Sequence, residues 1–432
     1  MKNSTAVNNN HHILNLISTK DWIIAGLIFL LFFGIYFGLS RQLVQNTPIA
    51  KYDDILFEID TARAIIDMTV FSGNHYRTEV HPIYVLLVNP FAELVGKFIS
   101  PDPITAIFIN ALFGAAGTAL AYLIFRLMRI KRFSAALFCA LFGFSTSQIF
   151  LSAIPDTASL AVLTLLFTYT LFIYTLEYTT VHDWIWISAG ILTLGVTTTN
   201  FAQTFILYAL IQLKTDKQQN LRVTLWKIAR YALIVIAITV LLALLQKWIY
   251  PSSTLFFLPE VYFSELNYAS ISIFDEPLRI ASIVFKSFSA DTIIAPNPIF
   301  FEIHGRNIIP AVTFTDSSNY MITGIVGLIL WSSLLCLNLV QYLKAEKASL
   351  LTIGIVACLA FNFVLHSFYG IGEKNKIELF LYTGNITYLF ILLTAGWGKI
   401  TDRSYFLLIP LMAAAAINNL MVLQQIIHFL SF

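Results

Sequence analysis

Ionisable side chains that could do chemistry gather in residues 52–90 of an otherwise apolar chain. Asp60, Arg63 and Asp67 are spaced three and four residues apart, so in a helix they share one face. Such a face is either a solvated surface with two intrahelical ion pairs or a carboxylate held ready for acid–base work. Residues 74–82 then add two histidines, a cation, an acid and a proline suited to opening a helix. This density of polar groups favours a functional site.

The composition of the whole chain is that of a membrane protein. Hydrophobic residues make up 58% of the 432 residues and charged residues only 12%, whereas soluble domains have roughly 25% charged residues. Many apolar runs approach the roughly 20 residues that a helix needs to cross a bilayer. The net charge of +2 gives no indication of nucleic-acid binding. The three cysteines lie in separate apolar runs and indicate neither a disulfide framework nor a zinc site.

We therefore predict an all-α polytopic membrane protein with about eleven transmembrane helices. Residues 82–99 could form a further span, but the basic residues 129–132 would then face outward. If residues 82–99 instead lie along the membrane interface, residues 129–132 fall on the cytoplasmic side, as the positive-inside rule requires. The predicted spans are residues 22–40, 103–127, 133–151, 156–175, 183–199, 201–214, 231–249, 320–343, 348–368, 377–397 and 404–430.

The polar regions around these spans complete the predicted organisation. Residues 1–21, rich in Asn and His, are predicted to be a disordered cytoplasmic N-terminus. Residues 22–432 are predicted to form a single transmembrane domain. Two long loops, residues 41–102 and 250–319, are predicted to lie on the extracytoplasmic side.

Several shorter elements are expected near these loops. The first outer loop contains predicted interfacial helices at residues 59–71 and 82–99. The second contains an amphipathic helix at 276–288, which either covers the first loop as a lid or only fills space. The fifth and sixth spans are short and meet at residues 197–200, which predicts a helix break whose backbone is satisfied by hydroxyl and amide groups.

The positions of the acids distinguish between classes of membrane protein. No Asp, Glu, Lys or Arg lies near the middle of a predicted span, whereas ion- and proton-coupled transporters place such groups at membrane depth. The acids gather instead on the predicted outer side. They are Asp53, Asp54, Glu58, Asp60, Asp67, Glu79, Asp102 and Asp156.

At these residues the chain resembles the GT-C integral-membrane glycosyltransferases, which include protein O-mannosyltransferases and aminoarabinose transferases. Asp60 with Arg63 resembles the acidic motif on the first loop helix of that family. His81-Pro82-Ile83 is similar to the element that ends the same loop. The layout of one span, a long outer loop with flat helices and then many spans is also similar.

Later parts of the chain extend the resemblance. Pro155-Asp156-Thr157 is similar to the second acidic site of the family, and His366 to Gly370 together with Phe380-Leu-Tyr382 resembles its late outer loop. The family often has two adjacent acids where this chain has Asp60-Thr61, so the pair Asp53-Asp54 is an alternative to Asp60.

The resemblance implies that a sugar is transferred, with inversion, from a polyprenyl-phosphate donor to a lipid, glycan or protein acceptor on the outer side of the plasma (inner) membrane. A carboxylate activates the attacking oxygen in such a reaction. Asp60 is the first candidate for this general base. Asp156 is expected either to orient the acceptor or act as a second acid, or to cap a helix.

The leaving group would be a phosphate monoester with a second pKa of about 6, which departs without a general acid but needs positive charge around it. The candidates for substrate binding are Arg63, Arg77, Glu79, His81, Lys374, Lys376 and Tyr382. Lys374 and Lys376 either grip the phosphate or extend to lipid headgroups. No cofactor is certain, and a divalent metal ion has only the weak candidates Glu79 and His81. A transporter or flippase of lipid-linked sugars and a non-catalytic assembly factor remain as alternatives.

Overall fold

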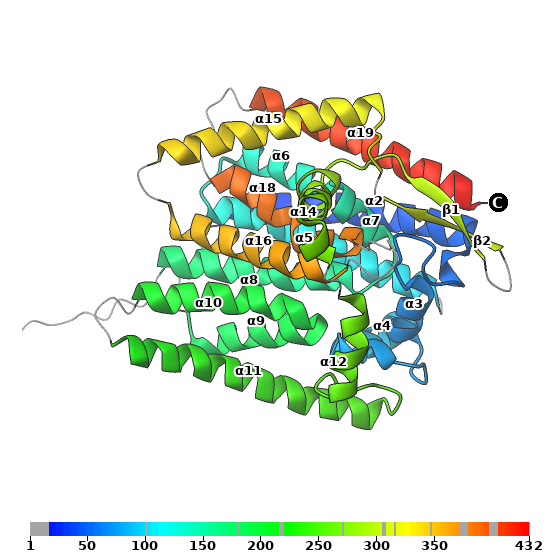
Figure 1. Cartoon of the computed structure of the whole chain (residues 1–432), viewed down its shortest axis with the longest axis horizontal. Helices are drawn as coiled ribbons and strands as arrows, with labels where there is room; N and C mark the ends of the chain where they lie inside the picture. The colour runs from blue at the N-terminus through cyan, green and yellow to red at the C-terminus, as the bar shows by residue number, and fades with distance from the viewer. Residues whose placement is uncertain are drawn as a thin grey trace, which may run out of the picture.

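The computed structural model describes residues 17–99, 102–178, 181–215, 220–269, 272–304, 308–314, 317–345, 348–370, 379–396 and 405–431. Nearly all regular structure in these residues is helical, and the long helices run side by side (Figure 1). The predicted N-terminal segment before Ile17 and both Lys374 and Lys376 lie outside the described residues.

Seven helices in the described part of the chain are long and apolar enough to cross a membrane. They are α2 (Thr19–Asn46), α5 (Ile104–Leu127), α8 (Ala158–Tyr178), α11 (Leu221–Ile249), α15 (Ile322–Lys344), α16 (Leu350–Phe368) and α19 (Tyr405–Leu430). This set of helices is that of a multi-pass membrane protein. Leu27 on α2 and Leu241 on α11 are more than half exposed, as expected for side chains that face lipid.

The predicted span at 133–151 is a bent pair of helices. α6 (Arg132–Gly143) and α7 (Thr146–Ala153) meet at an angle of 59°, and together they could make an eighth span. The break has a local cause, because the Ser145 hydroxyl accepts a hydrogen bond from the Gln148 backbone and starts a new helix. The three other predicted spans coincide with shorter helices. These are α9 (Asp183–Val196), α10 (Phe201–Thr215) and the pair α17 (Leu379–Tyr382) and α18 (Thr387–Gly396).

Both predicted outer loops contain short helices. α3 (Thr61–Thr69) and α4 (Tyr84–Gly96) confirm the two helices expected in the first loop. In the second loop, α14 (Pro277–Lys286) confirms the amphipathic helix, and α12 (Pro259–Glu265) precedes it. The remaining short helical segments are η2 (Pro48–Ala50), η3 (Tyr76–Glu79), η4 (Thr198–Asn200), η5 (Leu266–Tyr268), α13 (Ser272–Asp275), η6 (Ser287–Asp291) and η8 (Thr383–Asn385).

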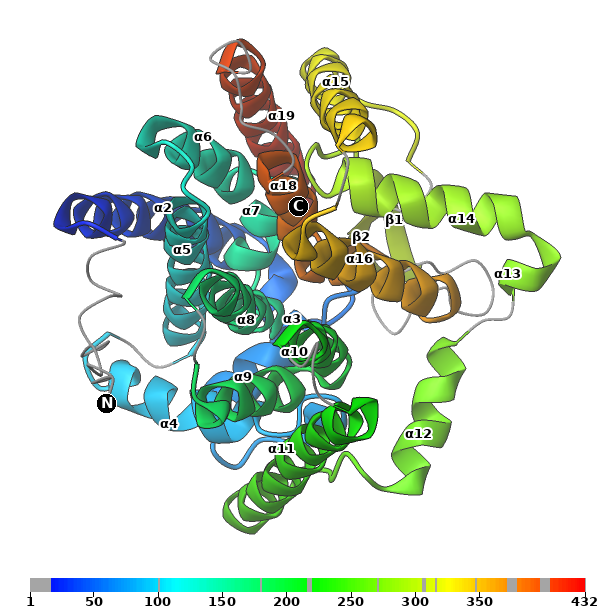
Figure 2. The same ribbon diagram turned by 90° about the vertical axis from the view of Figure 1, so that its left-hand side faces the viewer.

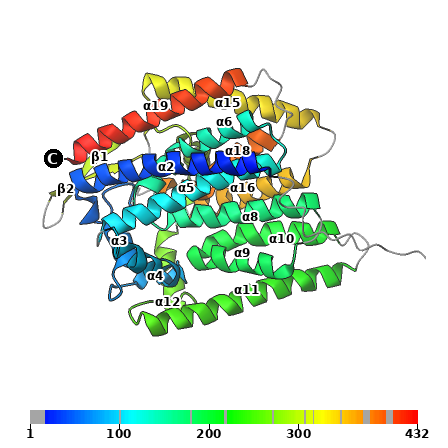
Figure 3. The same ribbon diagram turned by 180° about the vertical axis from the view of Figure 1, so that it is seen from behind.

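A small antiparallel hairpin in the second loop departs from the expected all-helical fold. β1 (Ile299–His304) pairs with β2 (Ile308–Thr313), with Ile299 opposite Thr313. Leu56 of the first loop forms a bridge to Val312, so the hairpin ties the two loops together. Figures 1 and 3 show α3, α4, α12 and the hairpin on the same side of the molecule.

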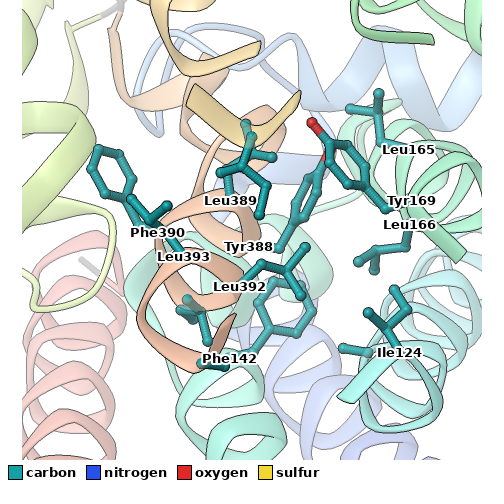
Figure 4. Close-up of a cluster of buried hydrophobic side chains, with 14 of the residues drawn as sticks. Ile124, Phe142, Leu165, Leu166, Tyr169, Tyr388, Leu389, Phe390, Leu392 and Leu393 are labelled. Carbon is teal, nitrogen blue, oxygen red and sulfur yellow. The ribbon is translucent and has the colours of Figure 1, made fainter. Parts of the chain in front are cut away.

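The centre of the bundle is packed with apolar side chains around α18. Leu389 and Leu392 of α18, Leu166 and Tyr169 of α8 and Phe142 of α6 are almost completely buried (Figure 4). Close packing of this kind fixes the positions of α8 and α18, whose ends at one side carry the polar side chains described below.

The opposite end of the bundle is held by a buried acid. Asp21 of α2 is 1% exposed, and its Oδ1 lies 2.9 Å from Arg126 Nε and 2.8 Å from Arg132 Nε. These contacts join the starts of α2 and α6 to the end of α5. The α2 start and the α3–α4 region lie at opposite ends in Figure 3.

Candidate functional site

A cavity of about 580 Å³ lies where the first and second loops meet the ends of α8, α9 and α10. Its lining includes seven of the nine side chains that the sequence singled out. They are Asp60, Arg63, Arg77, Glu79, His81, Asp156 and Tyr382. The other two, Lys374 and Lys376, lie outside the described residues. The fold therefore brings together side chains that are more than 300 positions apart in sequence.

Asp60 lies directly before α3, yet its carboxylate does not cap that helix. The capping bond comes instead from Asp53, whose Oδ1 accepts a hydrogen bond from the Arg63 backbone N–H at 3.0 Å. Asp60 Oδ2 lies 3.0 Å from Arg63 Nε and 4.0 Å from Arg77 Nε. Its side chain remains 25% exposed. The Asp60 carboxylate is therefore held between two guanidinium groups at the cavity wall.

The chain just before Asp60 has an unusual backbone. Asp54, Phe57 and Glu58 have φ angles of 63°, 55° and 57°, a region that residues with a side chain rarely adopt. The Phe57 ring is packed against the rings of Phe314 and Phe380, at centroid distances of 4.4 and 4.7 Å. This aromatic contact holds the loop in a conformation that places Asp54 and Glu58 in the cavity lining.

A buried chain of ion pairs lies behind Asp60. Arg63 Nη1 is 2.7 Å from Asp67 Oδ2, and Asp67 Oδ1 is 2.8 Å from His75 Nδ1. Burial opposes the charge on Arg63, but Asp67 and Asp60 outweigh it and raise the pKa of the guanidinium. His75 lies in the loop just before η3, and its side chain is fully buried. The two intrahelical ion pairs expected of the 60–67 face are therefore present, but they are largely buried rather than solvated.

Arg77 connects the first loop to the second. Its Nη1 lies 3.2 Å from Glu265 Oε1 and 3.5 Å from Glu79 Oε1, and Glu265 Oε2 accepts a hydrogen bond from the Tyr369 hydroxyl. Burial opposes the charge on Arg77, but Glu265 and Asp60 raise its pKa above the usual range. Sequence reasoning missed Glu265, because no local spacing relates it to a residue 188 positions away.

Residues 256–268 of the second loop line the cavity, whereas α14, for which a lid was one interpretation, contributes no lining residue. Thr78 Oγ1 hydrogen-bonds to the Thr254 carbonyl at 2.9 Å, which joins the two loops beside Arg77. Val261 and Tyr262 of α12 line the cavity. Figure 2 shows α12 at the edge of the molecule, between α11 and α13.

His81 is held in one orientation by the end of α9. Its Nδ1 lies 2.7 Å from the Val196 carbonyl and donates to it, which leaves Nε2 as an acceptor, 3.5 Å from Thr157 Oγ1. Burial, together with the nearby Arg63 and Arg77, lowers the pKa of His81 to about 3. The ring is therefore neutral. His81 offers a hydrogen-bond acceptor, and our expectation that it supplies positive charge is corrected accordingly.

Asp156 lies at the start of α8 and is 5% exposed. Its Oδ2 accepts a hydrogen bond from the Ala158 backbone N–H at 3.2 Å, so the helix-cap alternative is present. The side chain also lines the cavity. Burial raises the pKa of Asp156, against the opposing effect of Arg63. Capping therefore does not remove Asp156 from the candidate site.

The predicted break between α9 and α10 forms part of the cavity wall. Thr198 N–H donates to the Val80 carbonyl at 3.1 Å, and Asn200 Nδ2 donates to Asn385 Oδ1 at 3.0 Å. The break is thus satisfied within the protein, as expected for backbone at membrane depth. Ile83 N–H also donates to the Gly195 carbonyl at 2.8 Å, which fixes the His81 loop against α9.

The remaining wall of the cavity is apolar. It includes Ile236 and Val240 of the membrane-spanning α11, together with Phe256 and Phe257. Ile236 is also 43% exposed. The cavity lining is therefore amphipathic, because it combines charged groups with apolar side chains, two of which belong to the apolar helix α11.

The described residues contain no group of three His, Cys, Asp or Glu side chains that could hold a metal ion. Glu79 and His81, the two weak metal candidates, both line the cavity, but Glu79 is paired with Arg77. Burial raises the pKa of Glu79, with Arg77 opposing.

No protein-family model matches this chain, and no curated protein matches it.

Proposed function

We propose that this protein is an inverting glycosyltransferase of the GT-C type, which moves a sugar from a polyprenyl-phosphate donor to an acceptor on the extracytoplasmic side of the inner membrane. The amphipathic cavity is the observation that carries this proposal. A polyprenyl-phosphate sugar has a polar head and a long apolar chain, and the cavity lining offers both charged groups and apolar side chains.

The polar wall provides the groups that the reaction needs. Asp60 takes the proton from an acceptor hydroxyl as the hydroxyl oxygen bonds to the anomeric carbon of the sugar. The bond from that carbon to the phosphate oxygen breaks, and its electron pair leaves with the phosphate. Attack and departure on opposite faces invert the anomeric configuration.

Arg77 is the cation best placed to receive the leaving phosphate. Its buried Nε donates no hydrogen bond within the part of the chain that the structure describes. A phosphate oxygen can accept from this N–H, since guanidinium and phosphate form strong charge-assisted hydrogen bonds. Lys374 and Lys376 are proposed as further cations for the same phosphate.

Other lining residues have supporting roles in the proposal. The first prenyl units lie along Ile236 and Val240. The neutral His81 accepts a hydrogen bond from a sugar or acceptor hydroxyl through Nε2. Asp156 and Tyr382 orient the acceptor.

Sugar transfer with Asp60→Asn tests the proposal. The purified protein in lipid nanodiscs is given a panel of polyprenyl-phosphate sugars, and both transferred sugar and free polyprenyl phosphate are measured. Asp60→Asn should lower kcat by about 10²–10⁴-fold, the contribution of a general base. Undiminished transfer by folded Asp60→Asn would contradict the role of Asp60, and Asp54→Asn would then test the alternative acid.

Glu276→Gln is the matched control. Glu276 precedes α14 as Asp60 precedes α3, and its Oε2 pairs with Arg279 at i+3, 2.7 Å away, but it does not line the cavity. This variant should retain full activity. A flippase, the main alternative, would move the donor across the bilayer without releasing free polyprenyl phosphate.

A further inference from the structure

We infer that Asp67 and His75 are positioning residues that hold Asp60 in its catalytic orientation through Arg63. This inference rests on the proposed function, because it assigns the two residues to the same reaction. Neither residue lines the cavity, so their effect on the reaction must pass through other side chains.

The contacts form one continuous chain from the cavity inward. Asp60 Oδ2 accepts from Arg63 Nε at 3.0 Å, and Arg63 Nη1 donates to Asp67 Oδ2 at 2.7 Å. Asp67 Oδ1 then lies 2.8 Å from His75 Nδ1. Asp67 and His75 are at most 4% exposed, whereas Asp60 is 25% exposed. The chain therefore begins in the cavity and ends in the protein interior.

His75 is surrounded by groups that fix the position of its ring. Nδ1 faces the Asp67 carboxylate at 2.8 Å and Nε2 faces the Phe71 carbonyl at 3.2 Å. The Tyr250 ring stands edge-on at 5.5 Å, and the His75 backbone N–H donates to Ser252 Oγ.

Asp60, Arg63 and Asp67 alternate in charge, and His75 contacts the inner oxygen of Asp67. This pairing allows Arg63 and Asp67 to be buried, because an unpaired buried charge is strongly destabilising. It also holds Arg63 against the attraction of Asp156, the third carboxylate whose charge acts on it. Asp60 thus meets a fixed guanidinium, and its second oxygen is free to face the acceptor.

The test uses Asp67→Asn and His75→Gln in the sugar-transfer assay, with kcat and KM for the donor measured separately. A misplacement of about 1 Å lowers rates by up to about 100-fold. We therefore expect kcat to fall about 10–100-fold in each variant. KM for the donor should stay within about threefold, because Arg77 and the apolar wall still hold the carrier.

Asp21→Asn is the control for a purely structural effect. Asp21 is as buried as Asp67 and pairs with two arginines, but it lies at the opposite end of the bundle. This variant should lose thermal stability and retain kcat. If Asp67→Asn fails to fold, His75→Gln still carries the test. The glutamine amide can donate to Asp67 and so maintain the fold, but it lacks the rigid ring that also contacts the Phe71 carbonyl, so Asp67 is held less firmly.

The outcomes separate this inference from the proposed function. If wild type is active and Asp60→Asn is inactive, the proposed function holds. An unchanged kcat in His75→Gln would then overturn the positioning role alone. The positioning role would also be overturned if kcat in Asp67→Asn and His75→Gln fell only in proportion to the loss of folded protein, as in the control Asp21→Asn. A wild type that transfers no sugar from any polyprenyl phosphate would overturn the proposed function, and the positioning role with it.

Discussion

Replacing Glu265 with Gln should strengthen the binding of polyprenyl phosphate. Glu265 Oε1 lies 3.2 Å from Arg77 Nη1 and therefore occupies part of the guanidinium that the phosphate needs. A bound phosphate must displace this carboxylate or share the guanidinium with it. Gln keeps the shape and one acceptor oxygen, but it removes the negative charge that competes with the phosphate.

The size of the effect follows from the contact. Hydrogen bonds to charged groups contribute about 1.5–3 kcal/mol, and Arg77 and Glu265 are only 20% and 15% exposed, so solvent screens the pair incompletely. The glutamine oxygen retains part of this interaction. We expect a net gain of about 1.4 kcal/mol, which is a tenfold lower Kd.

The measurement is equilibrium binding of a short-chain polyprenyl phosphate to the purified protein at fixed ionic strength. Glu260→Gln is the control, because Glu260 lies on the same helix, is exposed and does not line the cavity. An unchanged or higher Kd in Glu265→Gln, with Glu260→Gln equal to wild type, would refute the assignment of Arg77 to the phosphate.

Three further predictions concern other walls of the cavity. Burial raises the pKa of Asp156, so the folded state loses stability as the pH rises from the usual aspartate value of about 3.9 through the raised value. Asp156→Asn keeps the helix cap but cannot ionise, so it lacks this loss of stability. Its melting temperature should exceed that of wild type at pH 8, by about 2–4 °C for each kcal/mol of stability that wild type loses. Near pH 3.5 the two melting temperatures should be equal. A melting-temperature difference that does not change with pH would contradict this. Val240→Trp should raise KM about tenfold for every donor that carries the first prenyl units, because the larger side chain displaces them from the apolar part of the lining and each buried methylene contributes about 0.8 kcal/mol; an unchanged KM would argue against prenyl binding there. Gly195→Ala should destabilise the protein by about 1–3 kcal/mol in thermal unfolding, because its new methyl group would meet Ile83 Cγ1 at 2.3 Å; an unchanged melting temperature would mean that Ile83 moves freely.

The local part of the site could be predicted from the sequence because its signals are local. The spacing of Asp60, Arg63 and Asp67 defines a helix face without any knowledge of the fold, and α3 confirms that helix. The amphipathic pattern near 276–288 predicted α14 for the same reason. Apolar runs likewise identified a polytopic membrane protein.

Long-range partners could not be predicted in this way. The pairing of Arg77 with Glu265 depends on how the second loop returns over the first, and the burial of His75 depends on Ser252 and Tyr250 at the end of α11. His81 was expected to be among the positive charges around the leaving phosphate. Its neutral state follows from burial beside two arginines, which only the folded chain reveals.

Two elements of the fold were missed for related reasons. The span at 133–151 reads as a continuous apolar run, and the capping hydroxyl of Ser145 that divides it into α6 and α7 is a single residue in that run. The β1–β2 hairpin has few residues and gains its support from Leu56, far earlier in the chain. Short strands that depend on distant pairing carry a weak sequence signal.

An experimental map of the protein with bound polyprenyl phosphate would test the central claim most directly. We predict that the phosphate lies in the cavity within hydrogen-bonding distance of Arg77, that the first prenyl units contact Ile236 and Val240, and that the Asp60 carboxylate faces the position of the anomeric carbon. A phosphate bound outside this cavity, with Asp60 remote from it, would contradict the account.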